Sequence, residues 1–131
     1  MKMTIELSKL QSHFAGNEWC VFKAYQFEEN TVTMELFIPK EISWFKGHFP
    51  EQAVLPGVAQ SNWACELAQY CFGLENFSKL SNLKFKSMIL PETTLQLKLV
   101  YKPEKHSVGF EYSDSTDTFS TGLLLFKSAI S

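Results

Sequence analysis

Residues 47–69 read GHFPEQAVLPGVAQSNWACELAQ, and this stretch decides how the rest of the chain is interpreted. His48 stands directly before Phe49-Pro50, so its backbone lies in a bend and not in a regular strand. Pro56 then fixes a backbone angle where a helix can begin, and Gly57 follows it. The stretch therefore predicts a histidine in a bend that runs into the N-terminus of a helix.

The helix is predicted to extend from Gly57 to about Phe72, with Gly73 as its C-terminal stop. A shorter helix is expected over residues 6–14. Segments rich in β-branched and aromatic residues predict strands at residues 19–27, 31–39, 81–88, 93–102, 106–113 and 118–126. One long helix among antiparallel strands indicates an α+β domain whose sheet wraps around that helix.

The length of 131 residues fits a single domain, residues 1–131, because the chain is too short for two. Hydrophobic residues make up 45% and aromatic residues 15%, which indicates a large core, a buried interface or an apolar tunnel. No apolar run reaches the length of a signal peptide or a membrane span. We therefore expect a cytoplasmic protein without a membrane segment.

The cysteines, histidines and charges narrow the function classes. Three cysteines without CxxC spacing predict buried thiols and favour neither disulfides nor a zinc site. The histidines lack metal-ligand spacing and no glycine-rich phosphate loop is present, so no metal, flavin or nucleotide cofactor is expected. A net charge of −2 argues against non-specific nucleic-acid binding. Residues 79–105 nevertheless carry six lysines against two glutamates, and form either a docking face for an anionic partner or a solvated surface.

The position of His48 before a helix N-terminus suits proton transfer. Free N–H groups and the positive end of the helix dipole near Gly57 can bind a carbonyl oxygen or a developing enolate. A histidine beside such a donor can abstract a proton from the carbon next to the carbonyl. A lone histidine is also often a structural residue, and the residues alone leave both readings open.

Residues 48–57, HFPEQAVLPG, and residues 84–92, KFKSMILPE, form two motifs. They resemble H-F-P-G-x-P-V-x-P-G and K-F-R-x-P-V-x-P-G-D of the hotdog-fold 3-hydroxyacyl-acyl carrier protein dehydratases of the FabA and FabZ type. The stretches WFKGHFP, LPGVAQSNWA and STGLLLF look closer still to the ApeI-like dehydratases of aryl polyene pathways. The resemblance implies a hotdog fold, in which an antiparallel sheet wraps around one long central helix.

The resemblance implies that His48 is the catalytic base and that the N–H of Gly57 polarises the thioester carbonyl. The family's helical carboxylate falls at Asn62, which is the main departure, because an amide can hydrogen-bond a hydroxyl but cannot give it a proton. Glu66, one helical turn further on, is the candidate acid if it is partly buried beside Trp63. It can equally be an exposed helix residue. A third alternative is that His48 itself returns the proton while Asn62 only orients the hydroxyl.

Aromatic and basic residues near the motifs suggest how a substrate would be held. Five apolar residues are expected either to line a tunnel for an apolar or conjugated acyl chain or to fill the core: Trp44, Phe45, Phe49, Trp63 and Met88. Lys84 and Lys86 would suit docking of an acidic acyl carrier protein. The resemblance also implies a homodimer with a site shared between subunits, and it leaves open a hetero-oligomer with a second hotdog subunit.

The leading interpretation is a hydro-lyase that converts a 3-hydroxyacyl thioester on acyl carrier protein to the trans-2-enoyl thioester, in fatty acid-like or aryl polyene biosynthesis. One alternative is an acyl thioesterase built on the same scaffold. The other is a catalytically silent acyl-binding partner subunit, which the missing carboxylate at Asn62 motivates.

Overall fold

The computed structural model describes residues 6–45 and 53–127. Within them the chain forms the helices α1 (Leu7–His13) and α2 (Gly57–Phe72) and two short 3-10 turns, η1 (Ser43–Phe45) and η2 (Pro103–Lys105). The strands are β1 (Val21–Glu28), β2 (Thr31–Phe37), β3 (Phe77–Phe85), β4 (Thr94–Lys102), β5 (Ser107–Ser113) and β6 (Thr118–Phe126).

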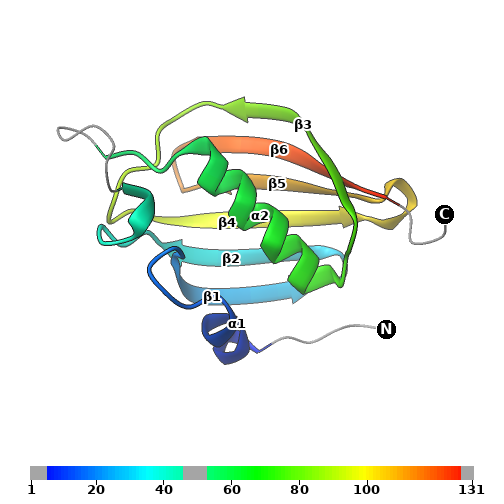
Figure 1. Ribbon diagram of the computed structural model, residues 1–131, viewed down its shortest axis with the longest axis horizontal. Coiled ribbons are helices and arrows are strands. Elements are labelled where there is room, and N and C mark those ends of the chain that lie inside the picture. Colours follow the sequence, from blue (N-terminus) through cyan, green and yellow to red (C-terminus); the bar gives the residue numbers. More distant parts are fainter. Residues whose placement is uncertain (1–5, 46–52, 128–131) are drawn as a thin grey trace.

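The strands form one sheet in the order β1-β2-β4-β5-β6-β3, and every neighbouring pair is antiparallel. Helix α2 lies across one face of this sheet, with its N-terminal end toward the end of β3 (Figure 1). The predicted α+β architecture, an antiparallel sheet around one long helix, is confirmed. None of the helices in the described ranges is long and apolar enough to cross a membrane.

Helix α2 has the limits predicted from its sequence. Pro56, with φ −64° and ψ 152°, is the extended residue before the first turn, and Gly73 ends the helix in the left-handed conformation with φ 65°. The helix buries seven side chains against the sheet: Ala59, Gln60, Trp63, Ala64, Leu67, Ala68 and Cys71. Six of the seven are apolar or weakly polar, so α2 is the centre of the core, and Gln60 is the exception.

The strand pattern on the β1 side also follows the sequence. Glu29 and Asn30 form the connection between β1 and β2, with Glu29 at a positive φ of 55°. Along β4 the side chains at alternate positions 95, 97 and 99 are buried, as the period of two predicts. The three cysteines are unpaired; Cys20 and Cys71 are buried as predicted, whereas Cys65 is only half-buried.

Strand β3 differs from its prediction. A strand was expected over residues 81–88, whereas β3 runs from Phe77 to Phe85. Its pairing with β6 begins at Phe77 opposite Phe126, and beyond Phe85 the N–H groups of Lys86 and Ser87 both turn to the Phe119 carbonyl. The sequence pattern misplaces β3 because this edge strand is mostly exposed on both faces and shows no apolar alternation.

Candidate functional site

Gly57, the predicted carbonyl donor, is the first residue of α2. Pro56 precedes it without a side-chain capping bond, and the Pro56 carbonyl accepts the N–H groups of Ala59 (3.1 Å) and Gln60 (3.2 Å). Among residues 6–45 and 53–127, the N–H groups of Gly57 and Val58 meet no acceptor. As far as the described residues go, two backbone donors at the positive end of a 16-residue helix are therefore left for a ligand oxygen.

The ring of Phe85 closes one side of this helix end. A Cβ atom added at Gly57 would lie 3.0 Å from Cε1 and from Cε2 of Phe85, and still closer to Cζ. Phe85 is the last residue of β3 and is 51% exposed, so its ring covers Gly57 while leaving its other face open. Glycine at position 57 is what allows this close approach.

Asn62 and Glu66 lie on one face of α2, as their spacing predicts. The amide Nδ2 of Asn62 donates a hydrogen bond of 2.8 Å to the Oε2 of Glu66. Both side chains are exposed in the single chain, and Val58, one turn before Asn62, is 65% exposed. Glu66 is therefore not partly buried beside Trp63. In this single chain it is an exposed helix residue, which was the alternative interpretation.

The tryptophans gather on the other side of α2. Trp63 is fully buried, and its indole stacks on Trp19 with ring centroids 5.8 Å apart. The carbonyl oxygen of Glu18 accepts the indole N–H of Trp63 and that of Trp44, each at 3.0 Å. Trp63 thus lies in the core, and Trp44 and Phe45 are partly buried against it.

The exposed apolar side chains concentrate at the opposite end of the sheet. Strand β3 ends the strand order, so within the described residues its outer edge is unpaired. We call the exposed apolar residues on and just after this strand the β3 edge surface: Phe77, Leu83, Phe85, Met88 and Leu90. Met88 is 58% exposed, and Lys84 and Lys86 are also exposed here. The second motif therefore lies on an open surface beside the N-terminus of α2.

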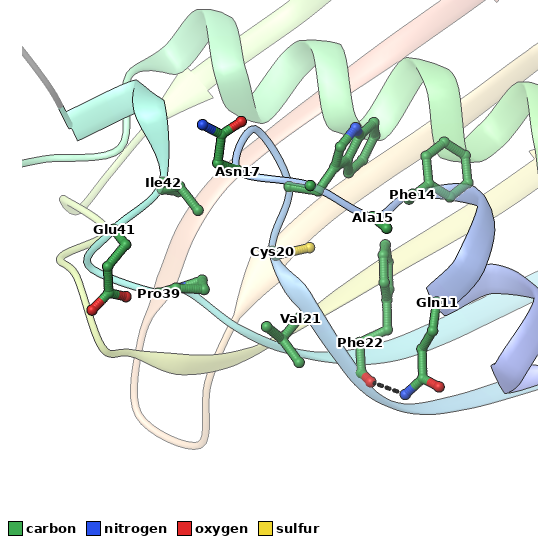
Figure 2. A pocket seen from close by; sticks show the side chains of 12 residues that line it. Gln11, Phe14, Ala15, Asn17, Cys20, Val21, Phe22, Pro39, Glu41 and Ile42 are labelled. Carbon is green, nitrogen blue, oxygen red and sulfur yellow. Dashed lines mark hydrogen bonds between the residues drawn. The ribbon is translucent and has the colours of Figure 1, made fainter.

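A cavity of about 380 Å³ lies on the β1 side of the molecule, between the α1–β1 connection and the residues before η1. Figure 2 shows Pro39, Glu41 and Ile42 on one side of it and Phe14 and Phe22 on the other. None of the predicted site residues lines it. Its lining includes Cys20, whose thiol pKa is raised by burial. This cavity is separate from the helix end described above.

His48 and Phe49, the predicted base and one predicted lining residue, lie outside the described residues. The described part of the site consists of Gly57 and the pair formed by Asn62 and Glu66. The sequence analysis did not single out Gln60, which is buried directly behind the helix end. Its spacing of four and seven residues from the buried Ala64 and Leu67 is the signal that could have identified it.

Comparison with solved structures defines the class of this fold. The dehydratase heterocomplex ApeI:P from Xenorhabdus doucetiae matches with a TM-score of 0.79 and 29% identity, over 84% of this chain and 99% of that one. An uncharacterized protein from Erwinia carotovora subsp. atroseptica matches with a TM-score of 0.75 and 30% identity, over 86% and 99%. The dehydratase domain of PpsC from Mycobacterium tuberculosis, in complex with C12:1-CoA, has the same fold at a TM-score of 0.65 and 18% identity, over 84% and 44%. The fold is that of the hotdog dehydratases.

The model of the ApeI-like family, described as ApeI dehydratase, matches residues 24–123. The chain therefore belongs to the ApeI-like dehydratase family. Among proteins with curated descriptions, none matches it.

Proposed function

We propose that this protein removes water from a 3-hydroxyacyl thioester on acyl carrier protein and so forms the trans-2-enoyl thioester. The observation that carries the proposal is the open N-terminus of α2, where the Gly57 N–H has no acceptor in the described part of the chain and stands within the family's motif. A thioester carbonyl bound there becomes more polarised as charge develops on its oxygen. The cytoplasmic location and the aryl polyene or fatty acid-like pathway expected from the sequence belong to this proposal.

The reaction needs a base, a carbonyl donor and a route for the hydroxyl. In our proposal His48 takes the proton from C2, and the Gly57 N–H stabilises the resulting enolate oxygen. The C2–C3 double bond forms as the C3 hydroxyl leaves, and that hydroxyl takes up a proton to depart as water. The proton comes from Glu66 or is returned by His48.

The Asn62–Glu66 hydrogen bond supports a division of labour between these two side chains. With Nδ2 of Asn62 donating to Glu66, the Oδ1 of Asn62 is left to accept a hydrogen bond from the C3 hydroxyl. Glu66 then supplies the ionisable oxygen that Asn62 lacks. Glu66→Gln is expected to lower kcat if Glu66 is the donor and to leave it near the native value if His48 returns the proton.

We further propose that a second hotdog subunit pairs along β3 and covers the Asn62 face of α2. The β3 edge surface joins exposed apolar side chains to a strand edge that no described strand pairs with, a combination that favours association with another chain. The Xenorhabdus doucetiae relative is a heterocomplex, which favours a different hotdog chain as partner, and a homodimer is the other form. Leu83→Glu should weaken the assembly in sedimentation velocity. The matched control is Val21→Glu on β1 at the far edge of the sheet, because Val21 is 41% exposed and Leu83 is 37% exposed.

Lys84 and Lys86 are proposed to dock the acidic carrier protein, because both are exposed beside the helix end. Reversal of both charges to glutamate should raise KM for the carrier-bound substrate and leave KM for a short carrier-free thioester unchanged. Reversal of Lys98 and Lys102, which are exposed on β4, is the matched control. Equal effects of the two double variants would show that net charge, and not this surface, sets the affinity.

The proposed activity is tested by mass spectrometry of carrier protein loaded with a 3-hydroxyacyl chain. The native protein should cause the loss of one water, and His48→Ala should abolish this loss while circular dichroism shows an intact fold. Release of free carrier thiol would indicate thioester hydrolysis instead. Activity that requires Asn62→Asp, or that a second hotdog chain supplies even when this chain carries His48→Ala, would favour a silent partner subunit, the second candidate, which the amide at position 62 motivates.

A further inference from the structure

Buried polar side chains meet beneath the N-terminal turn of α2. Gln60 is 3% exposed and Ser120 is fully buried, within a core that is otherwise mostly apolar. Such groups lose their hydration on folding, so they are found where each polar atom has a partner. The partners of Gln60 show what this amide holds in place.

Gln60 connects the segment that enters α2 to the sheet. Its Nε2 donates to the carbonyl oxygen of Leu55 at 3.1 Å, and its Oε1 accepts the hydroxyl of Ser120 at 2.6 Å. The hydroxyl of Tyr112 donates to the backbone carbonyl of Gln60 at 2.7 Å. Ser120 lies opposite Tyr112 on β5 and opposite Phe85 on β3, so the same register holds the ring that covers Gly57.

Leu55 is held from both sides, two residues before Gly57. Its N–H donates to the Ile89 carbonyl at 2.8 Å, and its own carbonyl accepts the Gln60 amide. Pro56, the N-cap residue, forms no side-chain capping bond that would set the direction of the entering chain. The Leu55–Gln60 bond is therefore the side-chain contact by which the helix holds the entering chain, in addition to the bonds from the Ala59 and Gln60 N–H groups to the Pro56 carbonyl.

We propose that Gln60 is a positioning residue for the dehydration. Its bond to Leu55 holds the segment Leu55–Pro56 and thereby orients the Gly57 N–H. This role of Gln60 rests on the function proposed above. A purely apolar side chain at position 60 would also fill the core. It would leave the Leu55 carbonyl unpaired, so that the Leu55–Pro56 peptide could shift. Such a shift would tilt the first turn of α2, which carries the Gly57 N–H, away from the orientation that the substrate carbonyl needs.

The test compares Gln60→Met with Ser120→Ala and Tyr112→Phe. Gln60→Met keeps the volume and removes the bond to Leu55, whereas each control removes a different bond of the same network and leaves that one intact. At a temperature where all three are folded, Gln60→Met should lower kcat roughly 10- to 100-fold with little change in KM, because misplacing a positioned group by about 1 Å can cost about 100-fold. The controls should lower Tm but keep kcat within about three-fold of the native value, since they do not release the Leu55 carbonyl. If Gln60→Met does not fold, Gln60→Leu replaces it, because its branched apolar side chain also removes the donor for Leu55 and places no ionisable group in the core.

The second readout is amide hydrogen exchange and the 1H–15N shift of Gly57, which need no turnover. Both should change in the Gln60 variant and stay native in the controls. A Gln60 variant with native kcat and a native Gly57 signal would overturn the proposal, and so would controls that lose as much kcat as Gln60→Met. If the native protein does not dehydrate the substrate either alone or with its second hotdog subunit, the proposed function fails. The Gly57 signal alone then still decides whether Gln60 orients this N–H.

Discussion

Replacement of Gly57 by alanine should change the stability of the protein little and its dehydratase activity strongly. The added Cβ would press on the tip of the Phe85 ring, with two further ring carbons at 3.0 Å. Because Phe85 is 51% exposed, its ring can turn outward, at a cost of roughly 0.5–1.5 kcal/mol if it leaves a preferred rotamer. Alanine in a helix gains up to about 1 kcal/mol over glycine. These terms nearly cancel, so the free energy of unfolding should change by no more than about 1 kcal/mol.

The activity should respond very differently. The new methyl group and the displaced ring stand beside the N–H that the thioester carbonyl is proposed to use. Loss of one such donor typically costs about 100- to 1,000-fold in kcat. We expect Gly57→Ala to lose at least about 10-fold, because the N–H is hindered and not removed. Urea denaturation followed by circular dichroism and the carrier-bound dehydration assay measure the two quantities on the same preparation.

Phe85→Leu and the double variant Gly57→Ala/Phe85→Leu complete the test. With the ring shortened, the alanine should no longer press on it, so the double variant should be at least as stable as Phe85→Leu alone. Native kcat in Gly57→Ala would refute the donor role of this N–H. A loss clearly above about 1 kcal/mol would refute the argument that the ring can move, since overpacking of a rigid site costs about 1–3 kcal/mol.

Two further sets of predictions concern the core and a half-buried thiol. Trp63→Ala should lower the free energy of unfolding by about 3–5 kcal/mol, because Trp63 is fully buried. Trp44→Phe should lower it by only about 1 kcal/mol, because the Glu18 carbonyl keeps its hydrogen bond from the Trp63 indole. Similar losses for the two variants in urea denaturation would contradict the placement of Trp63 in the core and of Trp44 at its margin. Burial, and to a smaller extent the nearby Glu66 carboxylate, raises the pKa of Cys65 to about 11. Iodoacetamide at pH 8 should therefore modify Cys65 slowly in the folded protein and faster in Glu66→Gln. Equal rates in the two proteins would exclude an effect of Glu66. The raised pKa means that the folded state favours the neutral thiol of Cys65. The stability that this thiol contributes should be complete below about pH 8.5 and should be lost as the pH rises toward 11. Urea denaturation across this range should show a smaller fall in stability for Cys65→Ser.

The sequence predicts the parts of this fold that local chemistry controls. Pro56 and Gly73 mark both limits of α2 because each restricts or permits a particular backbone angle. The connection between the strands predicted at 19–27 and 31–39, and the alternation along β4, are likewise local patterns. The predicted bounds of β3 were wrong because this edge strand is exposed on both faces, so its sequence has no alternation of apolar and polar residues.

The candidate site was only partly predictable for a different physical reason. The same-face relation of Asn62 and Glu66 follows from helical geometry, and it is confirmed by their hydrogen bond. Whether Trp63 lined a tunnel or filled the core depended on tertiary packing, because α2 buries much of its circumference and an aromatic residue suits both places. Gln60 looks like an ordinary polar helix residue until its partners on β5 and β6 are known.

The convergence of two indole N–H groups on the Glu18 carbonyl has a practical consequence for spectroscopy. The chain contains three tryptophans, and Trp19, Trp44 and Trp63 all stand at this one locus. Intrinsic fluorescence is therefore a local signal, which reports on where α2, the connection before β1 and the turn η1 meet. Since Trp44 belongs to η1, emission can follow rearrangements of this turn without a label. The β3 side of the molecule has no native fluorophore of this kind, so a tryptophan introduced at Leu90 would give it an independent signal.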